Sequence, residues 1–169
     1  MIDQHHTASV SRAFARKSAV YDEFGKNHVN LSRMRQKVYG AVERHIQPSS
    51  HLLEINAGTG LDATEMVRRG HSVHATELSG GMMKAIQSKI KQFRMDDRLT
   101  AEQLSFTALD QIKNGPFDAV YSNFGGLNCI PDLRSVTRHL THVLKPGGIA
   151  VWVVMPRICP WEIGLFFKD

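Results

Sequence analysis

Two acidic side chains stand at the ends of short strand-like segments, where parallel strands would end. The first is Glu54, within residues 51–55, and the glycines Gly58 and Gly60 follow it at once. Residues 61–67 read as the start of a helix. Glycines let a ligand approach the backbone closely, so a strand, a glycine turn and a helix N-terminus favour a nucleoside cofactor, although tight turns also use glycine for backbone angles alone. An acid here would repel a diphosphate, so the turn favours a ligand that carries a positive charge.

The second acid, Glu77, comes at the end of the second expected strand, residues 72–75, and precedes Leu78. In a doubly wound sheet this position lies beside the first glycine turn. A carboxylate there can accept hydrogen bonds from both hydroxyl groups of a ribose. The alternative is a charge in the first turn of the next helix, a role that Ser79 can fill as the N-cap instead. The spacing favours the ribose role.

Two later turns carry side chains that suit the rest of a nucleoside ligand or its substrate. Ser105 and Phe106 offer a polar partner and an apolar platform for an adenine ring, although a strand-end Phe is also typical of a core. Residues 117–122 lead into Asn123 and two glycines, where an amide can orient a substrate or cofactor. Asn and Gly also build turns for conformational reasons alone, so both alternatives stay open.

Strand-like and helix-like segments alternate along the chain from residue 51 onward. The expected strands cover residues 51–55, 72–75, 99–104, 117–122 and 149–155. The expected helices cover residues 30–46, 61–69, 81–93 and 132–144, with a weak turn at 107–112. This alternation predicts an α/β fold, a doubly wound parallel sheet with helices on both faces. The apolar fifth segment predicts a buried strand, and the Pro-Gly-Gly sequence before it predicts the turn that ends the preceding helix.

Composition narrows the class of protein further. The chain has 169 residues, a length that fits one domain with its own core. Its net charge is +5, but the basic residues are scattered among acids, so a nucleic-acid partner is disfavoured. No segment is long and apolar enough for a membrane span. The two cysteines and nine histidines show no metal-ligand spacing, so no metal is expected, and a cytoplasmic location is the default.

Together these segments resemble the class I S-adenosylmethionine-dependent methyltransferases, and the resemblance covers about residues 12–160. It implies a Rossmann-like sheet with the strand order 3-2-1-4-5. It also implies an N-terminal cover in residues 1–29 and a methyltransferase core in residues 30–169. In the family, the glycine turn wraps the methionine part of S-adenosylmethionine, Glu77 matches the acid that holds the ribose, and Ser105-Phe106 matches the adenine position. The cofactor-binding residues expected on this basis are Tyr21, Glu54, Asn56, Ala57, Gly58, Gly60, Glu77, Leu78, Ser105, Phe106 and Asn123.

The chain departs from this family at three points. Gly is usual where Asn56 stands, Asp is usual where Ser105 stands, and the helix and antiparallel strands that follow the fifth strand are absent. Asn tolerates a positive φ better than other non-glycine residues, so the turn is expected to keep its shape. The chain is therefore expected to be a C-terminally truncated member. Its fifth strand is then an exposed edge that can pair two copies into a homodimer.

The resemblance implies transfer of a methyl group from S-adenosylmethionine to a small-molecule acceptor by in-line displacement. Because the cofactor carries the activation, alignment and desolvation are the protein's main tasks, and no catalytic residue is assigned. One alternative is a module of the same fold that binds the cofactor without catalysis. An NAD-type oxidoreductase is less favoured, because Glu54 and the missing Gly-x-Gly-x-x-Gly register do not suit a pyrophosphate.

Overall fold

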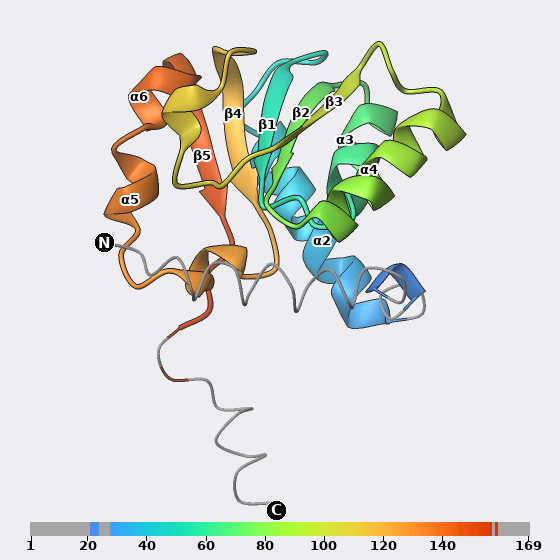
Figure 1. The fold of residues 1–169 in the computed structure, drawn as a ribbon, viewed down its shortest axis with the longest axis horizontal. Coiled ribbons are helices and arrows are strands. Elements are labelled where there is room, and N and C mark those ends of the chain that lie inside the picture. The colour runs from blue at the N-terminus through green and yellow to red at the C-terminus, as the bar shows by residue number, and fades with distance from the viewer. Residues whose placement is uncertain (1–20, 24–27, 157, 159–169) are drawn as a thin grey trace, which may run out of the picture.

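A parallel sheet of five strands forms the centre of the protein, in the order β3-β2-β1-β4-β5 (Figure 1). The computed structural model describes residues 21–23, 28–156 and 158. All four neighbouring pairs of strands are parallel. The predicted doubly wound sheet and its strand order are therefore confirmed. The strands are β1 (His51–Ile55), β2 (Ser72–Glu77), β3 (Leu99–Gln103), β4 (Phe117–Ser122) and β5 (Leu144–Trp152).

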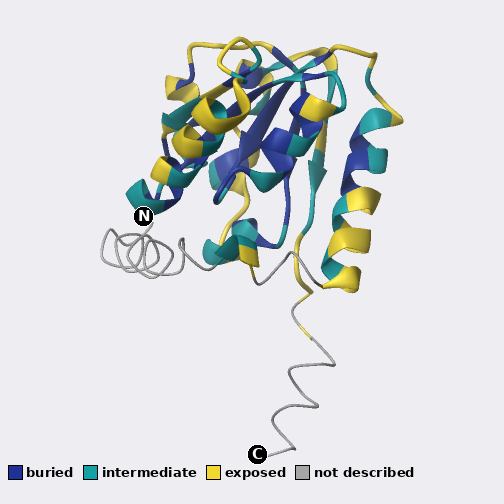
Figure 2. Ribbon diagram, turned by 90° about the vertical axis from the view of Figure 1, so that its right-hand side faces the viewer, coloured by how far each residue is buried: buried dark blue, intermediate teal, exposed yellow. Residues whose placement is uncertain are grey.

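Helices cover both faces of this sheet, and buried residues gather in its central strands (Figure 2). No helix in the described part of the chain has the length and apolar character needed to cross a membrane. One face carries α2 (Val29–Glu43), α3 (Leu61–Arg68) and α4 (Gly80–Phe93). The other face carries the 3₁₀ turns η1 (Leu109–Gln111) and η2 (Gly126–Cys129) and the short helices α5 (Arg134–Thr137) and α6 (Leu140–Val143).

Strand β1 divides the core into two layers. Successive side chains of a strand point to opposite faces of the sheet. Leu52 packs with residues of α2, α3 and α4, whereas Leu53 and Ile55 pack with residues of η1, η2, α5 and α6. Burying one such side chain contributes about 1.5–3 kcal/mol. This packing on both faces fixes the position of the glycine turn that follows β1.

The segment before β5 differs from the single helix predicted over residues 132–144, because α5 and α6 are separate one-turn helices. The N–H of His139 bonds to the carbonyl of Val136, three residues back, so the helix tightens there and ends. β-branched residues such as Thr137 and Thr141 also weaken helix formation in this segment.

The fifth strand begins earlier than the predicted start at residue 149. Leu144 already pairs with Phe117, and Ile149 pairs with Ala119. The residues between them, which include the Pro-Gly-Gly sequence, therefore form a bulge opposite a single residue of β4. The predicted turn before the strand is in fact part of the strand.

The fifth strand is also more exposed than predicted, because no residue of β5 is buried. The strand ends at Trp152, whereas Val154 and Met155, which the sequence places in a buried strand, are 49% and 53% exposed. Among the described residues β5 has a neighbouring strand on one side only. An apolar run at a sheet edge lacks the second neighbour that would bury it.

Candidate cofactor-binding cleft

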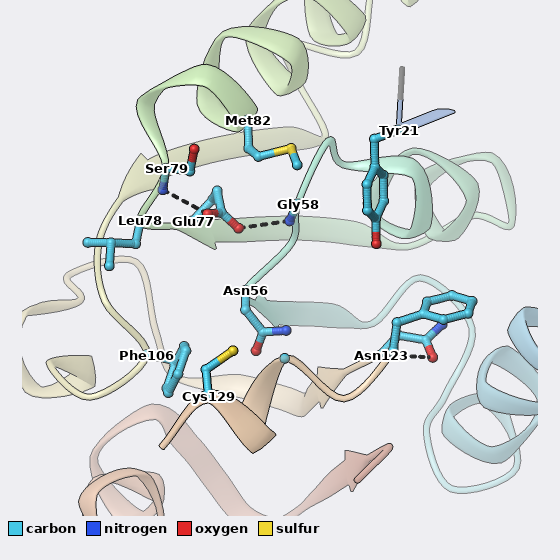
Figure 3. A pocket seen from close by; sticks show the side chains of 12 residues that line it. Tyr21, Asn56, Gly58, Glu77, Leu78, Ser79, Met82, Phe106, Asn123 and Cys129 are labelled. Carbon is cyan, nitrogen blue, oxygen red and sulfur yellow. Dashed lines mark hydrogen bonds between the residues drawn. The ribbon is translucent and has the colours of Figure 1, made fainter. Parts of the chain in front are cut away.

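A cleft opens where the carboxyl ends of β1, β2 and β4 meet, which is the usual ligand site of a doubly wound sheet. Its free space, counted to the open mouth and including open solvent, is about 680 Å³. Side chains converge on it from both sides (Figure 3). The lining residues are Tyr21, Asn56, Gly58, Glu77, Leu78, Ser79, Met82, Phe106, Asn123, Phe124, Gly126 and Cys129.

The turn after β1 bends through three left-handed residues. The backbone angle φ is +50° at Asn56, +58° at Gly58 and +76° at Gly60. Asn56 therefore keeps the shape of the turn, as expected. Gly60 is not part of the cleft lining, and a Cβ there would lie 3.0 Å from the Ile86 side chain. This glycine allows the turn to pack closely against α4.

The Glu77 side chain links the glycine turn to the end of β2 through hydrogen bonds. Its Oε2 accepts a hydrogen bond from the Gly58 N–H at 2.9 Å, and its Oε1 accepts one from the Ser79 N–H at 2.7 Å. Burial raises the pKa of Glu77, and these backbone donors oppose that shift. Ser79 is the N-cap residue of α4, but its side chain makes no capping bond. Glu77 therefore satisfies the helix N-terminus while it also lines the cleft.

The larger part of the cleft is apolar. Leu78, Met82 and Phe106 line it together with Cys129. Figure 3 shows Phe106 beside Cys129, on the wall opposite Glu77. Burial raises the pKa of the Cys129 thiol, which favours its protonated form. Such a lining suits a flat apolar group such as adenine.

The Ser105 side chain is not brought to the cleft with its neighbour Phe106. Its hydroxyl lies 2.8 Å from the Thr107 hydroxyl, and it also accepts a hydrogen bond from the Thr107 N–H. The Ser105 hydroxyl, which was expected to contact adenine, therefore makes its hydrogen bonds within this local turn instead.

A smaller compartment adjoins the cleft on the side of α2 and α3, with about 300 Å³ of free space when open solvent is included. Both compartments share Tyr21, Asn56, Gly58, Asn123 and Phe124. The smaller one carries charged side chains, so the site has an apolar part and a charged part. The residues that line only the smaller compartment are Arg35, Glu54, Ala57, Thr59, Leu61 and Asp62.

Asp62 connects three elements around the charged compartment. Its Oδ1 accepts hydrogen bonds from the Arg35 guanidinium and the Tyr39 hydroxyl, both on α2. Its Oδ2 accepts one from Asn123 Nδ2 at 3.2 Å, beyond the end of β4. The Arg35 guanidinium also lies 4.4 Å from the centre of the Phe124 ring. Asn123, one of the expected cofactor-binding residues, is therefore held by a largely buried charged network.

Residues 21–23 contact the glycine turn through Asp22. The Thr59 hydroxyl donates to Asp22 at 2.5 Å, and Lys89 of α4 forms an ion pair with Asp22 at 2.6 Å. Lys89 also donates to the Thr59 carbonyl at 3.0 Å. Tyr21 lines both compartments, and burial raises its pKa. The rest of the predicted cover, residues 1–20 and 24–27, lies outside the described residues.

Glu54 lies deep in the charged compartment. It is 2% exposed, and its Oε2 accepts a hydrogen bond from the Tyr121 hydroxyl at 3.2 Å. Burial and the nearby carboxylate of Asp62 raise the pKa of Glu54 well above its usual value. Glu54 therefore holds its proton more tightly than an exposed glutamate does.

The substitution Glu54→Gln is expected to remove a pH-dependent loss of stability. With its raised pKa, folded Glu54 keeps a proton that the unfolded chain releases, so the free energy of unfolding falls as the pH rises from the ordinary pKa to the raised one. Glutamine has no proton to lose and still offers an acceptor to Tyr121. Urea unfolding at about pH 5 and about pH 8 measures the effect. Relative to the wild type, the free energy of unfolding of the variant should be higher at about pH 8 than at about pH 5. The same difference between the two proteins at both pH values would contradict the prediction.

The sheet order and the divided cleft define a cofactor-binding protein of the doubly wound α/β class. Residues 52–148 match the family of methyltransferase domains, and the chain belongs to this family. A demethylmenaquinone methyltransferase of Corynebacterium glutamicum (strain R) is 29% identical over 125 residues, which cover 74% of this chain and 47% of that protein. The chain thus spans about half the length of this curated relative.

Solved structures share the fold. A protein described as an S-adenosyl-L-methionine-dependent methyltransferase of Methanococcus maripaludis has a TM-score of 0.69 at 18% identity, covering 81% of this chain and 63% of that one. The glycopeptide N-methyltransferase MtfA, in complex with S-adenosyl-L-methionine, has a TM-score of 0.61 at 23% identity, covering 70% and 53%. The class I methyltransferase fold expected from the sequence is confirmed.

Sequence reasoning missed the network around Asp62. Charges on a helix usually belong to a solvated face, and an acid in a first helical turn usually stabilises the helix N-terminus. One signal was available: Arg35 and Tyr39 are four residues apart and so share a helix face. Val38 and Val42, on the same side of α2, are buried, which places that face against the protein.

Proposed function

We propose that this chain is the cofactor-binding core of a methyltransferase that transfers a methyl group from S-adenosylmethionine to a small-molecule acceptor. The observation that carries the proposal is the position of Glu77, which lines a cleft with an apolar part and an adjoining charged part. The order of groups in S-adenosylmethionine matches this arrangement: adenine, ribose, sulfonium and amino acid. Membership of the methyltransferase domain family supports the same assignment.

The nucleoside fits the larger compartment. The Glu77 carboxylate offers acceptors to the ribose hydroxyl groups, and two of its lone pairs are already used by backbone N–H groups that fix its orientation. Leu78, Met82 and Phe106 offer an apolar surface to the adenine ring.

The amino-acid end fits the charged compartment. This end carries an ammonium and a carboxylate group, and the compartment holds the paired Arg35 guanidinium and Asp62 carboxylate. A paired base and acid complement a zwitterion. A diphosphate would instead meet the Asp62 carboxylate, so the charge pattern argues against the NAD-type alternative.

S-adenosylmethionine supplies a methyl group that its sulfonium charge has already activated. The residues of the chain then need to bind, orient and desolvate the reacting groups. Tyr21, Asn123 and Phe124 line both compartments, so they border the junction between the nucleoside and the amino-acid parts. We assign to these three side chains the binding of the methyl acceptor.

The 169-residue chain is expected to bind S-adenosylhomocysteine and S-adenosylmethionine with one-to-one stoichiometry in isothermal titration calorimetry. NADH is the control ligand and is expected to give no saturable heat. Circular dichroism first establishes that the sample is folded. A folded chain that gives no heat with either S-adenosyl ligand would refute the proposal, and binding without transfer to any acceptor would favour the non-catalytic module.

A small-molecule acceptor is supported by the demethylmenaquinone and glycopeptide methyltransferases to which the chain is similar. Three other expectations stay predictions: pairing of two copies through the edge of β5, a cytoplasmic location, and no nucleic-acid partner.

A further inference from the structure

The Asn56 side chain fits between the end of β4 and the start of η2. At the end of β4, the Ser122 hydroxyl donates a hydrogen bond to Asn56 Oδ1 at 2.9 Å. At the start of η2, Gly126 leaves room for the amide, because a Cβ there would collide with Asn56 Nδ2. The side chain that replaces the family's usual glycine therefore fits a matched space.

The Asn56 carboxamide lies at the junction of the two compartments. Asn56 lines both of them. Figure 3 shows its side chain pointing from the glycine turn into the space between the wall that carries Glu77 and the turn that carries Cys129. In S-adenosylmethionine the sulfur atom joins the nucleoside to the amino acid. A side chain at the junction of the compartments therefore lies beside that sulfur.

We propose that Asn56 is a positioning residue that faces the sulfonium centre, with its amide held by Ser122 and seated over Gly126. This inference rests on the proposed function. Because Ser122 occupies Oδ1, the amide turns Nδ2 toward Gly126, and its orientation is fixed. The neutral amide narrows the junction without adding a net charge beside the sulfur. It holds the sulfur between the Glu77 side and the Asp62 side of the site.

Asn56→Asp tests the position of this side chain through charge. Aspartate keeps the shape and the acceptor for Ser122, but it places a negative charge at the junction. S-adenosylmethionine carries one positive charge more than S-adenosylhomocysteine, so the ratio of their affinities should shift toward S-adenosylmethionine by about tenfold. Calorimetry with both ligands measures the ratio. Asn114→Asp, in the exposed loop before β4 at the amino ends of the strands, is the matched control and should leave the ratio unchanged.

If Asn56 only shapes the turn, Asn56→Asp would weaken the binding of S-adenosylmethionine and S-adenosylhomocysteine equally. An unchanged affinity ratio in Asn56→Asp would therefore overturn the proposal. Thermal unfolding establishes that each variant is folded before its ligand binding is compared.

A second test uses the matched space and does not depend on the aspartate variant. Gly126→Ala is expected to weaken S-adenosylhomocysteine binding about tenfold, because the new methyl group displaces the Asn56 amide. The double variant Asn56→Gly with Gly126→Ala should bind as Asn56→Gly alone does. Wild-type affinity in Gly126→Ala, or weaker binding in the double variant than in Asn56→Gly alone, would overturn the inference. Failure of the wild type to bind would instead refute the proposed function.

Discussion

Glu77→Ala is expected to bind S-adenosylhomocysteine about a hundredfold more weakly than the wild-type chain. Alanine removes the acceptors for the ribose hydroxyl groups, and a hydrogen bond to a charged group contributes about 1.5–3 kcal/mol. The N–H groups of Gly58 and Ser79 lose their acceptor as well, so the glycine turn loses its attachment to β2. The two losses act in the same direction.

Titration calorimetry at one pH and one salt concentration measures this loss. Asp97→Ala is the matched control, because it removes an exposed acid in the turn before β3 and should leave the affinity unchanged. Glu77→Gln keeps the size of the side chain and one carbonyl acceptor, so it should lie between alanine and the wild type. If Glu77→Ala binds S-adenosylhomocysteine as tightly as the wild type does, Glu77 acts only as a charge at the start of α4.

Asp62→Ala is expected to lower the free energy of unfolding by about 3–5 kcal/mol. The Arg35 side chain is only 17% exposed, and Asp62→Ala removes the carboxylate with which its guanidinium forms an ion pair. Tyr39 and Asn123 lose their acceptor at the same time. Removing one member of a buried charged network costs far more than removing one member of a surface pair.

Urea unfolding followed by circular dichroism measures the effect of Asp62→Ala, again with Asp97→Ala as the control. Asp62→Asn keeps an acceptor for Tyr39 but removes the charge, so it should be intermediate. A loss below about 1 kcal/mol would mean that the network contributes no more than an exposed ion pair does.

The parts of the fold that local sequence determines were predictable. Strands β1 and β4 have the bounds expected from their apolar runs, because helices cover both faces of the sheet there. The position of Glu77 in the cleft lining was predictable, since Glu77 ends a strand and precedes a helix. Each of these features depends on residues that are close together in the chain.

Features that depend on distant partners were not predictable. The bulge in β5 exists only in register with β4, and the exposure of Met155 follows from the edge position of that strand. The burial of Arg35 likewise depends on how α2 packs against α3. A sequence pattern gives the polarity of such a side chain but not which element covers it.

Under the proposed function, both compartments bind parts of the cofactor that the reaction leaves unchanged. Glu77 and the Arg35–Asp62 pair would contact the ribose and the amino acid, which the spent cofactor still carries. Binding of this uniform kind does not distinguish the starting compound from the product. The spent cofactor is therefore expected to compete with fresh cofactor for both compartments.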